Sequence, residues 1–353
     1  MMKYILHVMI AALFFIGCVD DNAYDGESGL ISGGTSSGTT AWLQQINDEV
    51  LVTNASLLRD QATMVNSAIV TLTQEQSRSN LNEARQLATT LFENWKALEA
   101  IYVAKKLDDV MIDIPAQIDV FNIGNIDIPE RLDAIFSGSS SLSGQLYQSA
   151  TRSMGALEYT LFGNQEFDDL NMTQRRADSA MIMANYLQGH INTIADFYEN
   201  GSEFVDAGED AVGIMINQLI DSTYKLKEWR IGDPAGYTVK YKDDPDAERL
   251  EYFHSLRSLE GMHAILNAQL AVMQNGLGEI AAANSAASEG DALVVLLQDA
   301  MTQIDAFDTA IEDGPSSAQV RELYNSVATI QTSYTALINA LNFQQDIIEA
   351  DGD

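Results

Sequence analysis

The chain has 353 residues, and its 51 Asp and Glu against 19 Lys and Arg give a formal net charge of −32 at pH 7. A surface of this sign repels a phosphate backbone, so the composition excludes nucleic acid as a partner and favours cations or cationic ligands. The negative charge has a second explanation that involves no ligand, because a high net charge also keeps a protein soluble. Cys18 is the only cysteine, which excludes a disulfide within the chain.

The amino terminus has the pattern of a targeting segment. Lys3 precedes an apolar run that ends at Ile16. The run is shorter than the roughly 20 apolar residues that a membrane-spanning helix needs, so residues 1–17 are predicted to be a cleaved signal peptide. Residues 15–18, with the sequence Phe-Ile-Gly-Cys, resemble a bacterial lipobox. That resemblance implies a lipid on Cys18 that anchors the mature protein to a membrane.

Residues 18–40 are acidic at first and then rich in Gly, Ser and Thr. Such a segment buries too little apolar surface to offset the entropy lost on ordering, so it is predicted to be a flexible tether. The acidic residues directly after Cys18 resemble the surface-export signals of some outer-membrane lipoproteins. We therefore expect an extracytoplasmic protein anchored to the outer membrane, with the periplasmic face and the cell surface both open as locations.

After residue 40 the apolar residues recur with a helical period, and alternating strand patterns are scarce. The five prolines lie between the periodic stretches, where a helix can end without losing an internal hydrogen bond. The segment 112–128 is irregular and rich in β-branched residues, and we expect it to be an ordered crossover packed on helices. About eight long helices are predicted, over residues 41–73, 81–102, 143–162, 173–200, 207–229, 246–275, 290–312 and 316–348.

The helical part of the chain exceeds what one hydrophobic core usually serves, so two domains are expected. Four of the predicted helices precede residue 201 and four follow it, and residues 200–208 are the predicted boundary. The predicted fold is all-α, with two helical domains that resemble four-helix bundles and pack side by side. The amino-terminal bundle is expected over residues 41–203 and the carboxy-terminal bundle over residues 204–349.

Common catalytic patterns lack the context that they need. Residues 34–38 match the spacing G-x-S-x-G, but that motif requires a turn from strand to helix, and these residues lie in the predicted tether. The sequence contains no H-E-x-x-H zinc motif, and the histidines beyond the signal peptide are His190, His254 and His263. On one helix His254 and His263 would point about 180° apart and could not share a metal. Both are expected to be satisfied surface or core residues.

Three short segments resemble signatures of the imelysin family. Residues 153–163 read S-M-G-A-L-E-Y-T-L-F-G, which is similar to the family's G-x-H-x-x-E helix and to the Phe-Gly ending that follows it. Residues 230–234 read R-I-G-D-P and resemble the family's Arg-Ile-Gly-x-Pro turn. Residues 251–259 read E-Y-F-H-S-L-R-S-L and resemble a later helix start with two serines three positions apart. The likeness spans residues 42–348.

The resemblance implies a binding site at a cleft between the two bundles, formed by Glu158, Arg230, Ser255 and Ser258. A carboxylate beside a guanidinium stays ionised, and two hydroxyls supply donors and acceptors, so these residue types suit a polar ligand. The alternative is structural. In that case Glu158 and Arg230 form a buried ion pair that joins the domains, and the serines cap helices.

The aromatic residues near these segments also have two explanations. Tyr159, Phe162, Phe167 and Trp229 could form an aromatic binding box. At helical spacing such residues more often belong to the core, and this is the favoured expectation.

The sequence departs from the family's metal-binding pattern at two positions. Ser153 stands in place of the first glycine and Gly155 stands in place of the histidine, so only Glu158 of the pattern remains. A His and a Glu three positions apart share one helical face and can bind one metal ion together. Iron is the cofactor that the resemblance implies, with Glu158 as its one candidate ligand here.

Three functions remain open. The first is a non-catalytic lipoprotein associated with iron uptake, which binds iron or an iron-bearing ligand in the cleft between the bundles. The second is a peptidase of the imelysin type, which needs a nucleophile or an activated water that the sequence does not display. The third is a surface module that recognises a glycan or a protein partner and needs no metal.

Overall fold

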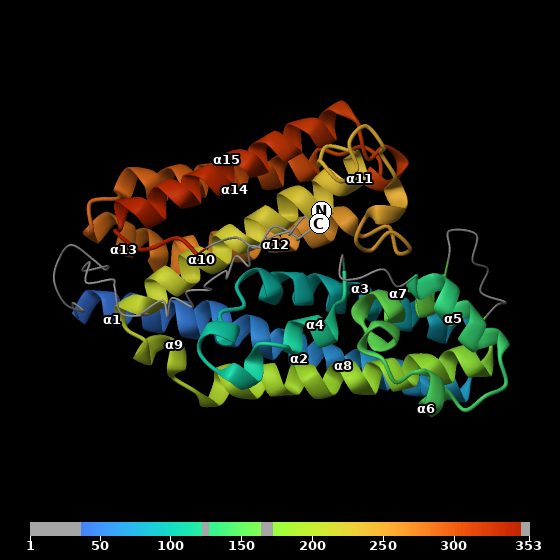
Figure 1. Ribbon diagram of the computed structural model, residues 1–353. Helices are drawn as coiled ribbons and strands as arrows, with labels where there is room; N and C mark the ends of the chain where they lie inside the picture. Colours follow the sequence, from blue (N-terminus) through green and yellow to red (C-terminus); the bar gives the residue numbers. More distant parts are fainter. Residues whose placement is uncertain (1–36, 122–126, 164–171, 347–353) are drawn as a thin grey trace, which may run out of the picture.

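The computed structural model describes residues 37–121, 127–163 and 172–346, and within these ranges the chain forms helices, turns and irregular segments with no β-strand (Figure 1). The predicted all-α fold is confirmed. The predicted signal peptide, the lipidated Cys18 and most of the predicted tether lie outside the described residues. Across the described ranges, every helix is too short or too polar to cross a membrane.

Three long helices form the amino-terminal half. Helix α2 (Thr53–Gln74) packs against both α3 (Arg78–Ala100) and α8 (Gln174–Asn200). Their apolar residues recur at helical spacing, so each helix has one face that it can bury against the others. The hydroxyls of Ser77 and Thr173 accept backbone N–H bonds in the first turns of α3 and α8. These caps fix where the two helices begin.

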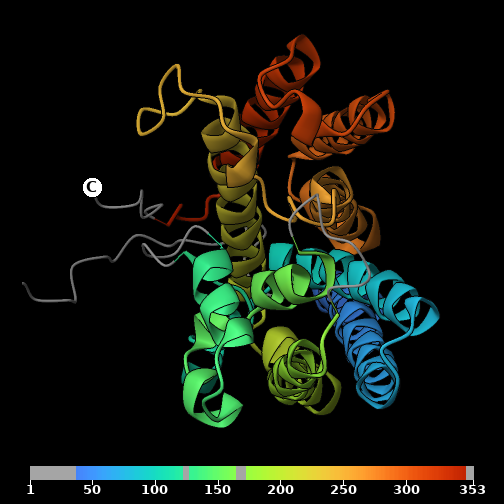
Figure 2. The same ribbon diagram turned by 90° about the vertical axis from the view of Figure 1, so that its right-hand side faces the viewer.

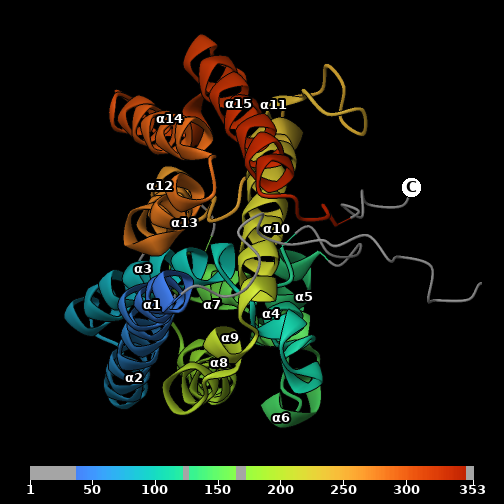
Figure 3. The ribbon, with the colours of Figure 1, turned by 90° about the vertical axis from the view of Figure 1, so that its left-hand side faces the viewer.

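The carboxy-terminal half contains the second group of long helices. Helix α15 (Ala318–Ala340) packs against α10 (Glu209–Lys225) and α14 (Ala287–Asp305), and α14 packs in turn against α12 (Ser258–Val272). Figure 1 shows these helices lying over those of the amino-terminal half. The turned views in Figure 2 and Figure 3 show the same two layers.

Short helices fill the connections between the long ones. Three π-helical segments occur in the described chain: η1 (Asn47–Val52) joins α1 to α2, η6 (Leu226–Gly232) continues α10, and η8 (Met273–Leu277) continues α12 and is kinked at Asn275 and Gly276. The short α-helices are α1 (Ser37–Ile46), α4 (Ile114–Ile118), α5 (Ile128–Ser137), α6 (Leu142–Gln145), α7 (Met154–Phe162), α9 (Glu203–Asp206), α11 (Asp233–Ala235) and α13 (Gly278–Ala283).

Two helices join the halves. Helix α3 packs against α2 and also against α12, and α1 reaches across to η8 and α13. As a result the buried apolar side chains form one contiguous cluster that runs through both halves. The chain passes from one half to the other between α8 and α10, where the boundary at residues 200–208 is predicted. The division into domains 41–203 and 204–349 stays a prediction.

The predicted tether ends earlier than expected. Helix α1 begins at Ser37 rather than at residue 41, and Thr39 is 2% exposed. The last residues of the segment 18–40 therefore belong to the folded body. The predicted crossover is confirmed in its described part, because it holds only the short α4 and buries Ile118 completely.

The helix predicted over residues 246–275 begins only at Ser258. The residues before it form turns, in which Tyr252 and Leu256 have φ values of 62° and 58°. Bulky residues rarely adopt positive φ, so tertiary contacts hold this segment in a conformation that its apolar spacing does not favour. The helix predicted over residues 143–162 is also interrupted, and only α6 and α7 within it are α-helical.

Gly276 allows α1 to approach η8 closely. Its φ is 144°, and a Cβ at this position would lie 2.6 Å from the Trp42 carbonyl oxygen. Gly276→Ala is expected to lower the free energy of unfolding by about 1–3 kcal/mol, because backbone strain adds to the clash. Urea denaturation measures the change.

Gly144→Ala is the matched control, since nothing lies within 4 Å of a Cβ added there. It should change the free energy of unfolding by less than about 0.5 kcal/mol. Equal losses in the two variants would contradict the docking of α1 on η8.

Candidate functional site

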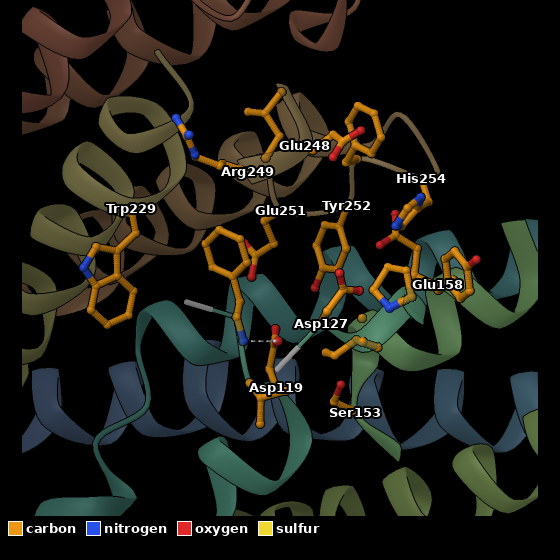
Figure 4. A pocket seen from close by; sticks show the side chains of 18 of the residues that line it. Asp119, Asp127, Ser153, Glu158, Trp229, Glu248, Arg249, Glu251, Tyr252 and His254 are labelled. Atoms are coloured by element: carbon orange, nitrogen blue, oxygen red, sulfur yellow. Dashed lines mark hydrogen bonds between the residues drawn. The ribbon is translucent and has the colours of Figure 1, made fainter. Parts of the chain in front are cut away.

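A pocket of about 620 Å³ lies between the two halves. Its walls come from the crossover after α4, from α7, from η6 and from the irregular segment before α12 (Figure 4). Turns rather than a single helix bring these segments together. The lining residues with polar or aromatic side chains are Asp119, Phe121, Asp127, Ser153, Glu158, Tyr159, Trp229, Asp233, Tyr241, Glu248, Arg249, Glu251, Tyr252, Phe253 and His254.

A fully buried ammonium group lies beside the pocket. Lys96 on α3 has 0% of its surface exposed. Its Nζ donates to Asp119 Oδ2 at 2.7 Å and to Glu251 Oε1 at 2.6 Å. A third bond of 2.7 Å reaches Glu99 Oε2 on the same helix. Burial alone would lower the pKa of Lys96, but the three carboxylates raise it above its usual value, so the group stays charged.

Arg230 in η6 completes this buried ion network. Its Nε donates to Glu251 Oε2 at 2.6 Å, and its Nη2 donates to Glu99 Oε2 at 2.9 Å. Burial raises the pKa of Glu99, but Lys96 and Arg230 outweigh it and bring the value to about 2. The network joins α3 in the amino-terminal half to η6 and Glu251 in the carboxy-terminal half. Its two cations are shared among three carboxylates, Glu99, Asp119 and Glu251.

Glu158 on α7 is 3% exposed and lies at the wall of the pocket. Its Oε1 accepts hydrogen bonds from the backbone N of Ser255 at 2.8 Å and from the Ser255 Oγ at 2.7 Å. The alternative of a Glu158–Arg230 ion pair is wrong, because the guanidinium bonds Glu99 and Glu251 instead.

Burial raises the pKa of Glu158 to about 8, the bonds from Ser255 oppose this rise, and the charge of Glu251 adds to it. Glu158 is therefore mostly a neutral carboxylic acid at pH 7.

Ser258 does not line the pocket but holds the backbone of Glu251, which does. It is 3% exposed, its Oγ donates to the backbone oxygen of Glu251 at 2.6 Å, and it also contacts Glu312 Oε1. Arg257 precedes the first turn of α12, and neither Ser255 nor Ser258 caps that helix. The expectation that the serines cap helices is therefore wrong. Of the four predicted site residues, only Glu158 lines the pocket. Ser255 bonds Glu158, whereas Arg230 and Ser258 bond Glu251, so the predicted residues form two separate groups of contacts beside the pocket.

Tyr252 is a pocket residue that sequence reasoning missed. Its ring stacks on Phe92 of α3, with the ring centroids 5.0 Å apart. Its hydroxyl is buried and has no hydrogen-bond partner. The helical spacing over residues 246–275 hid this position, because a turn with positive φ leaves no signal in the spacing of apolar residues.

His254 differs from its expected role. Its Nδ1 is buried without a hydrogen-bond partner, so the expectation of a satisfied histidine is wrong. The ring meets Tyr159 edge-on with centroids 5.0 Å apart, and burial lowers the pKa of His254 to about 4. His263 lies away from this pocket, with its Nε2 3.8 Å from Asp305 Oδ1.

The predicted aromatic residues divide between pocket and core. Tyr159 belongs to the buried core, as the core explanation expected, and it also lines the pocket together with Trp229. Phe162 packs against the hydrophobic core, as that explanation expected. Phe167 lies outside the described residues.

The donors at the pocket do not fit a bare iron ion. A Cβ added at Gly155 would meet only the Ser153 Oγ, at 4.0 Å, so this position has room for a side chain but supplies no ligand atom. Among the described residues, no three His, Cys, Asp or Glu side chains form a group that could hold a metal ion. Lys96 and Arg230 already pair with the neighbouring carboxylates. The prediction of Glu158 as a metal ligand gains no partner ligand from this arrangement.

Comparison with known proteins gives a consistent result. The model of the imelysin family matches residues 52–334. An imelysin-like protein from Psychrobacter arcticum has a similar structure, with a TM-score of 0.72 and 16% identity over 88% of this chain and 97% of that one. A protein from Parabacteroides distasonis, described as an iron-regulated protein A precursor, has a TM-score of 0.69 and 14% identity over the same shares. No curated protein matches the chain.

Glu158 gives the stability of the protein a specific pH dependence. Its pKa is about 8 in the folded chain, above the ordinary value of 4.5. Between these values the folded chain keeps a proton that the unfolded chain has lost, so the stability that this group contributes falls as the pH rises towards about 8. Relative to Glu158→Gln, the wild-type free energy of unfolding should fall by up to about 1.4 kcal/mol per pH unit in this interval.

Urea denaturation of both proteins between about pH 5 and pH 9 measures the difference. The comparison separates Glu158 from other buried carboxyls such as Glu312, whose pKa burial also raises. If the two stability curves run parallel across this range, Glu158 is not protonated in the folded protein.

Proposed function

Because the imelysin model covers residues 52–334, the chain belongs to the imelysin family, and from this premise we propose that it is a non-catalytic binding protein associated with iron uptake. Its ligand site is the pocket beside Glu158. It works outside the cytoplasm, with a lipid on Cys18 that holds it to the outer membrane at the periplasmic face or the cell surface. The basis for the lipid anchor is the sequence of the amino terminus.

The pocket beside Glu158 carries the proposal. Its volume of about 620 Å³ lies within the range of small-molecule sites, and its walls combine aromatic faces with a few polar groups. Tyr252 and His254 both line the pocket, and each has a buried polar atom without a hydrogen-bond partner in the protein. Buried polar groups in folded proteins are normally hydrogen-bonded. A ligand bound in the pocket could therefore supply the missing hydrogen bonds of the Tyr252 hydroxyl and of His254 Nδ1.

The cargo is an iron-bearing ligand rather than a bare ion. The name of the Parabacteroides distasonis relative connects that protein with regulation by iron. Asp119 and Glu251 at the pocket are paired with Lys96 and Arg230, and among the described residues no three His, Cys, Asp or Glu side chains form a group that could hold a metal ion. An organic chelate needs hydrogen bonds and aromatic contacts instead, and the pocket supplies both.

The geometry gives the peptidase hypothesis no support. Ser255 Oγ bonds the Glu158 carboxyl, and Ser258 Oγ bonds the Glu251 backbone oxygen. A serine nucleophile needs a general base, usually a histidine, within hydrogen-bond reach. Both hydroxyls instead form hydrogen bonds with groups in the wall of the pocket, and neither bonds a histidine.

Calorimetric titration of the purified protein tests the proposal with three probes: ferrous iron, ferric citrate and a neutral ferric trihydroxamate chelate. At least one chelate should bind with a stoichiometry of one, and ferrous iron should not bind. Glu158→Ala should weaken chelate binding by about tenfold or more, because the side chain lies at the pocket wall.

Glu93→Ala is the matched control. Glu93 lines a different cavity, and burial raises its pKa as well. This variant should bind the chelate as the wild type does. Absence of binding by both chelates, or equal losses in the two variants, would contradict the proposed function.

A further inference from the structure

The hydroxyl of Tyr252 has no role in the folded chain. The residue is 3% exposed, lines the pocket, and its Oη has no hydrogen-bond partner. The ring is fixed by stacking on Phe92 and by the Lys96 ammonium, which lies 5.7 Å from the ring centroid. A phenylalanine would keep both contacts. A buried hydroxyl without a partner costs free energy, and a ligand in the pocket that accepts its hydrogen bond would recover that cost.

His254 adds a second unsatisfied atom to the same pocket. Its Nδ1 is buried and unpartnered, and its ring is held between Tyr159 and Phe253, with centroid distances of 5.0 Å and 5.4 Å. Burial, together with the charge of Arg176, lowers the pKa of His254 to about 4, so the ring is neutral at pH 7. A neutral imidazole offers one donor and one acceptor.

Glu158 is the third polar group of this set. One oxygen accepts both bonds from Ser255, and burial keeps the carboxyl largely protonated at pH 7. A protonated carboxyl offers one O–H donor. Figure 4 shows Glu158, Tyr252 and His254 close together at one end of the pocket. Tyr252 and Glu158 therefore offer uncharged donors to a ligand, and His254 offers a neutral ring nitrogen as a further hydrogen-bonding group.

The charges around the pocket oppose an anionic ligand. Its wall carries the carboxylates of Asp127, Asp233 and Glu248 beside the ion network. Arg249, the one cation that lines the pocket, is paired with Asp244 at 2.8 Å. A bound anion would meet this negative field without a free cation to offset it. A bare cation, in turn, has no lone pair to accept the hydrogen bonds of Tyr252 and Glu158.

We propose that the pocket takes an uncharged organic ligand that presents oxygen acceptors, such as hydroxyl or carbonyl oxygens, to the Tyr252 hydroxyl and the Glu158 carboxyl. His254 Nδ1 supplies a further hydrogen bond at the same end. The aromatic faces of Tyr159 and Trp229 contact the apolar parts of the ligand. This inference rests on the proposed function and names the class of its ligand.

Two sources share this chemistry: a neutral iron chelate with carbonyl oxygens at its surface, and a neutral glycan. The experiment titrates the full protein at about pH 7 with a neutral ferric trihydroxamate, with maltotriose and with anionic ferric citrate. It is repeated on Tyr252→Phe. Removing the hydroxyl should weaken binding of a neutral probe by about tenfold, because one buried hydrogen bond is lost.

Tyr334→Phe is the matched control. Tyr334 is fully buried, and its hydroxyl also has no partner, but it lies on α15 among core residues. Both variants lose an unsatisfied hydroxyl, so both should keep or raise the Tm. Only Tyr252→Phe should lose affinity. A protein in which Tyr252 is merely structural would bind each probe equally in both variants.

The outcomes separate the two proposals. Binding of the neutral chelate that depends on Tyr252 supports both. Binding of maltotriose alone supports the ligand chemistry but removes the link to iron. Binding of ferric citrate alone, or neutral binding that is unchanged in Tyr252→Phe, overturns this inference and leaves the proposed binding function standing. No binding by any probe overturns both.

Discussion

Lys96 carries a full positive charge at a place where none of its surface reaches water. An unpaired ion in that position would cost several kcal/mol, so the fold has to bring carboxylates to it. Asp119 arrives from the crossover after α4, and Glu251 arrives from a segment 155 positions along the chain. Helix α3 packs against α2 and α12, and the ammonium therefore ties the two halves together at the point where α3 passes between them. Arg230 also pairs with Glu251 and Glu99, so two cations face three carboxylates in the cluster.

This ion network shapes the chemistry of the pocket next to it. Its carboxylates serve Lys96 and Arg230, so they form a wall rather than a set of free ligands. Glu158 lies apart from both cations, and burial keeps it protonated. With Gly155 in place of the family's histidine, the site loses the donor that a metal ion would use and keeps neutral hydrogen-bonding groups. Because Lys96 and Arg230 are paired with carboxylates, they are not available to bind an anionic ligand. The neutral hydrogen-bonding groups remain, and an uncharged ligand suits them.

The sequence predicts those parts of the molecule that depend on local interactions. A helix was expected over residues 173–200 and lies at Gln174–Asn200, because apolar spacing and the Thr173 cap act over neighbouring residues. The segment before α12 could not be predicted, since contacts of Tyr252 with Phe92 outweigh its helical spacing. Composition could not single out Asp119 or Glu251 among 51 acidic residues, because their partner lies far away in the sequence. Arg230, Ser255 and Ser258 were identified only through the family resemblance. Family motifs can mark residues whose partners lie far away in the sequence, whereas the spacing of apolar residues reports only local structure.

A double-mutant cycle between Lys96 and Glu251 tests most directly whether their buried contact joins the halves. Urea denaturation gives the free energy of unfolding for the wild type, Lys96→Met, Glu251→Gln and the double variant. We expect the sum of the two single-variant losses to exceed the loss in the double variant by a coupling energy of about 1–3 kcal/mol. Losses that add to within about 0.5 kcal/mol would contradict it, because the two residues would then stabilise the protein independently.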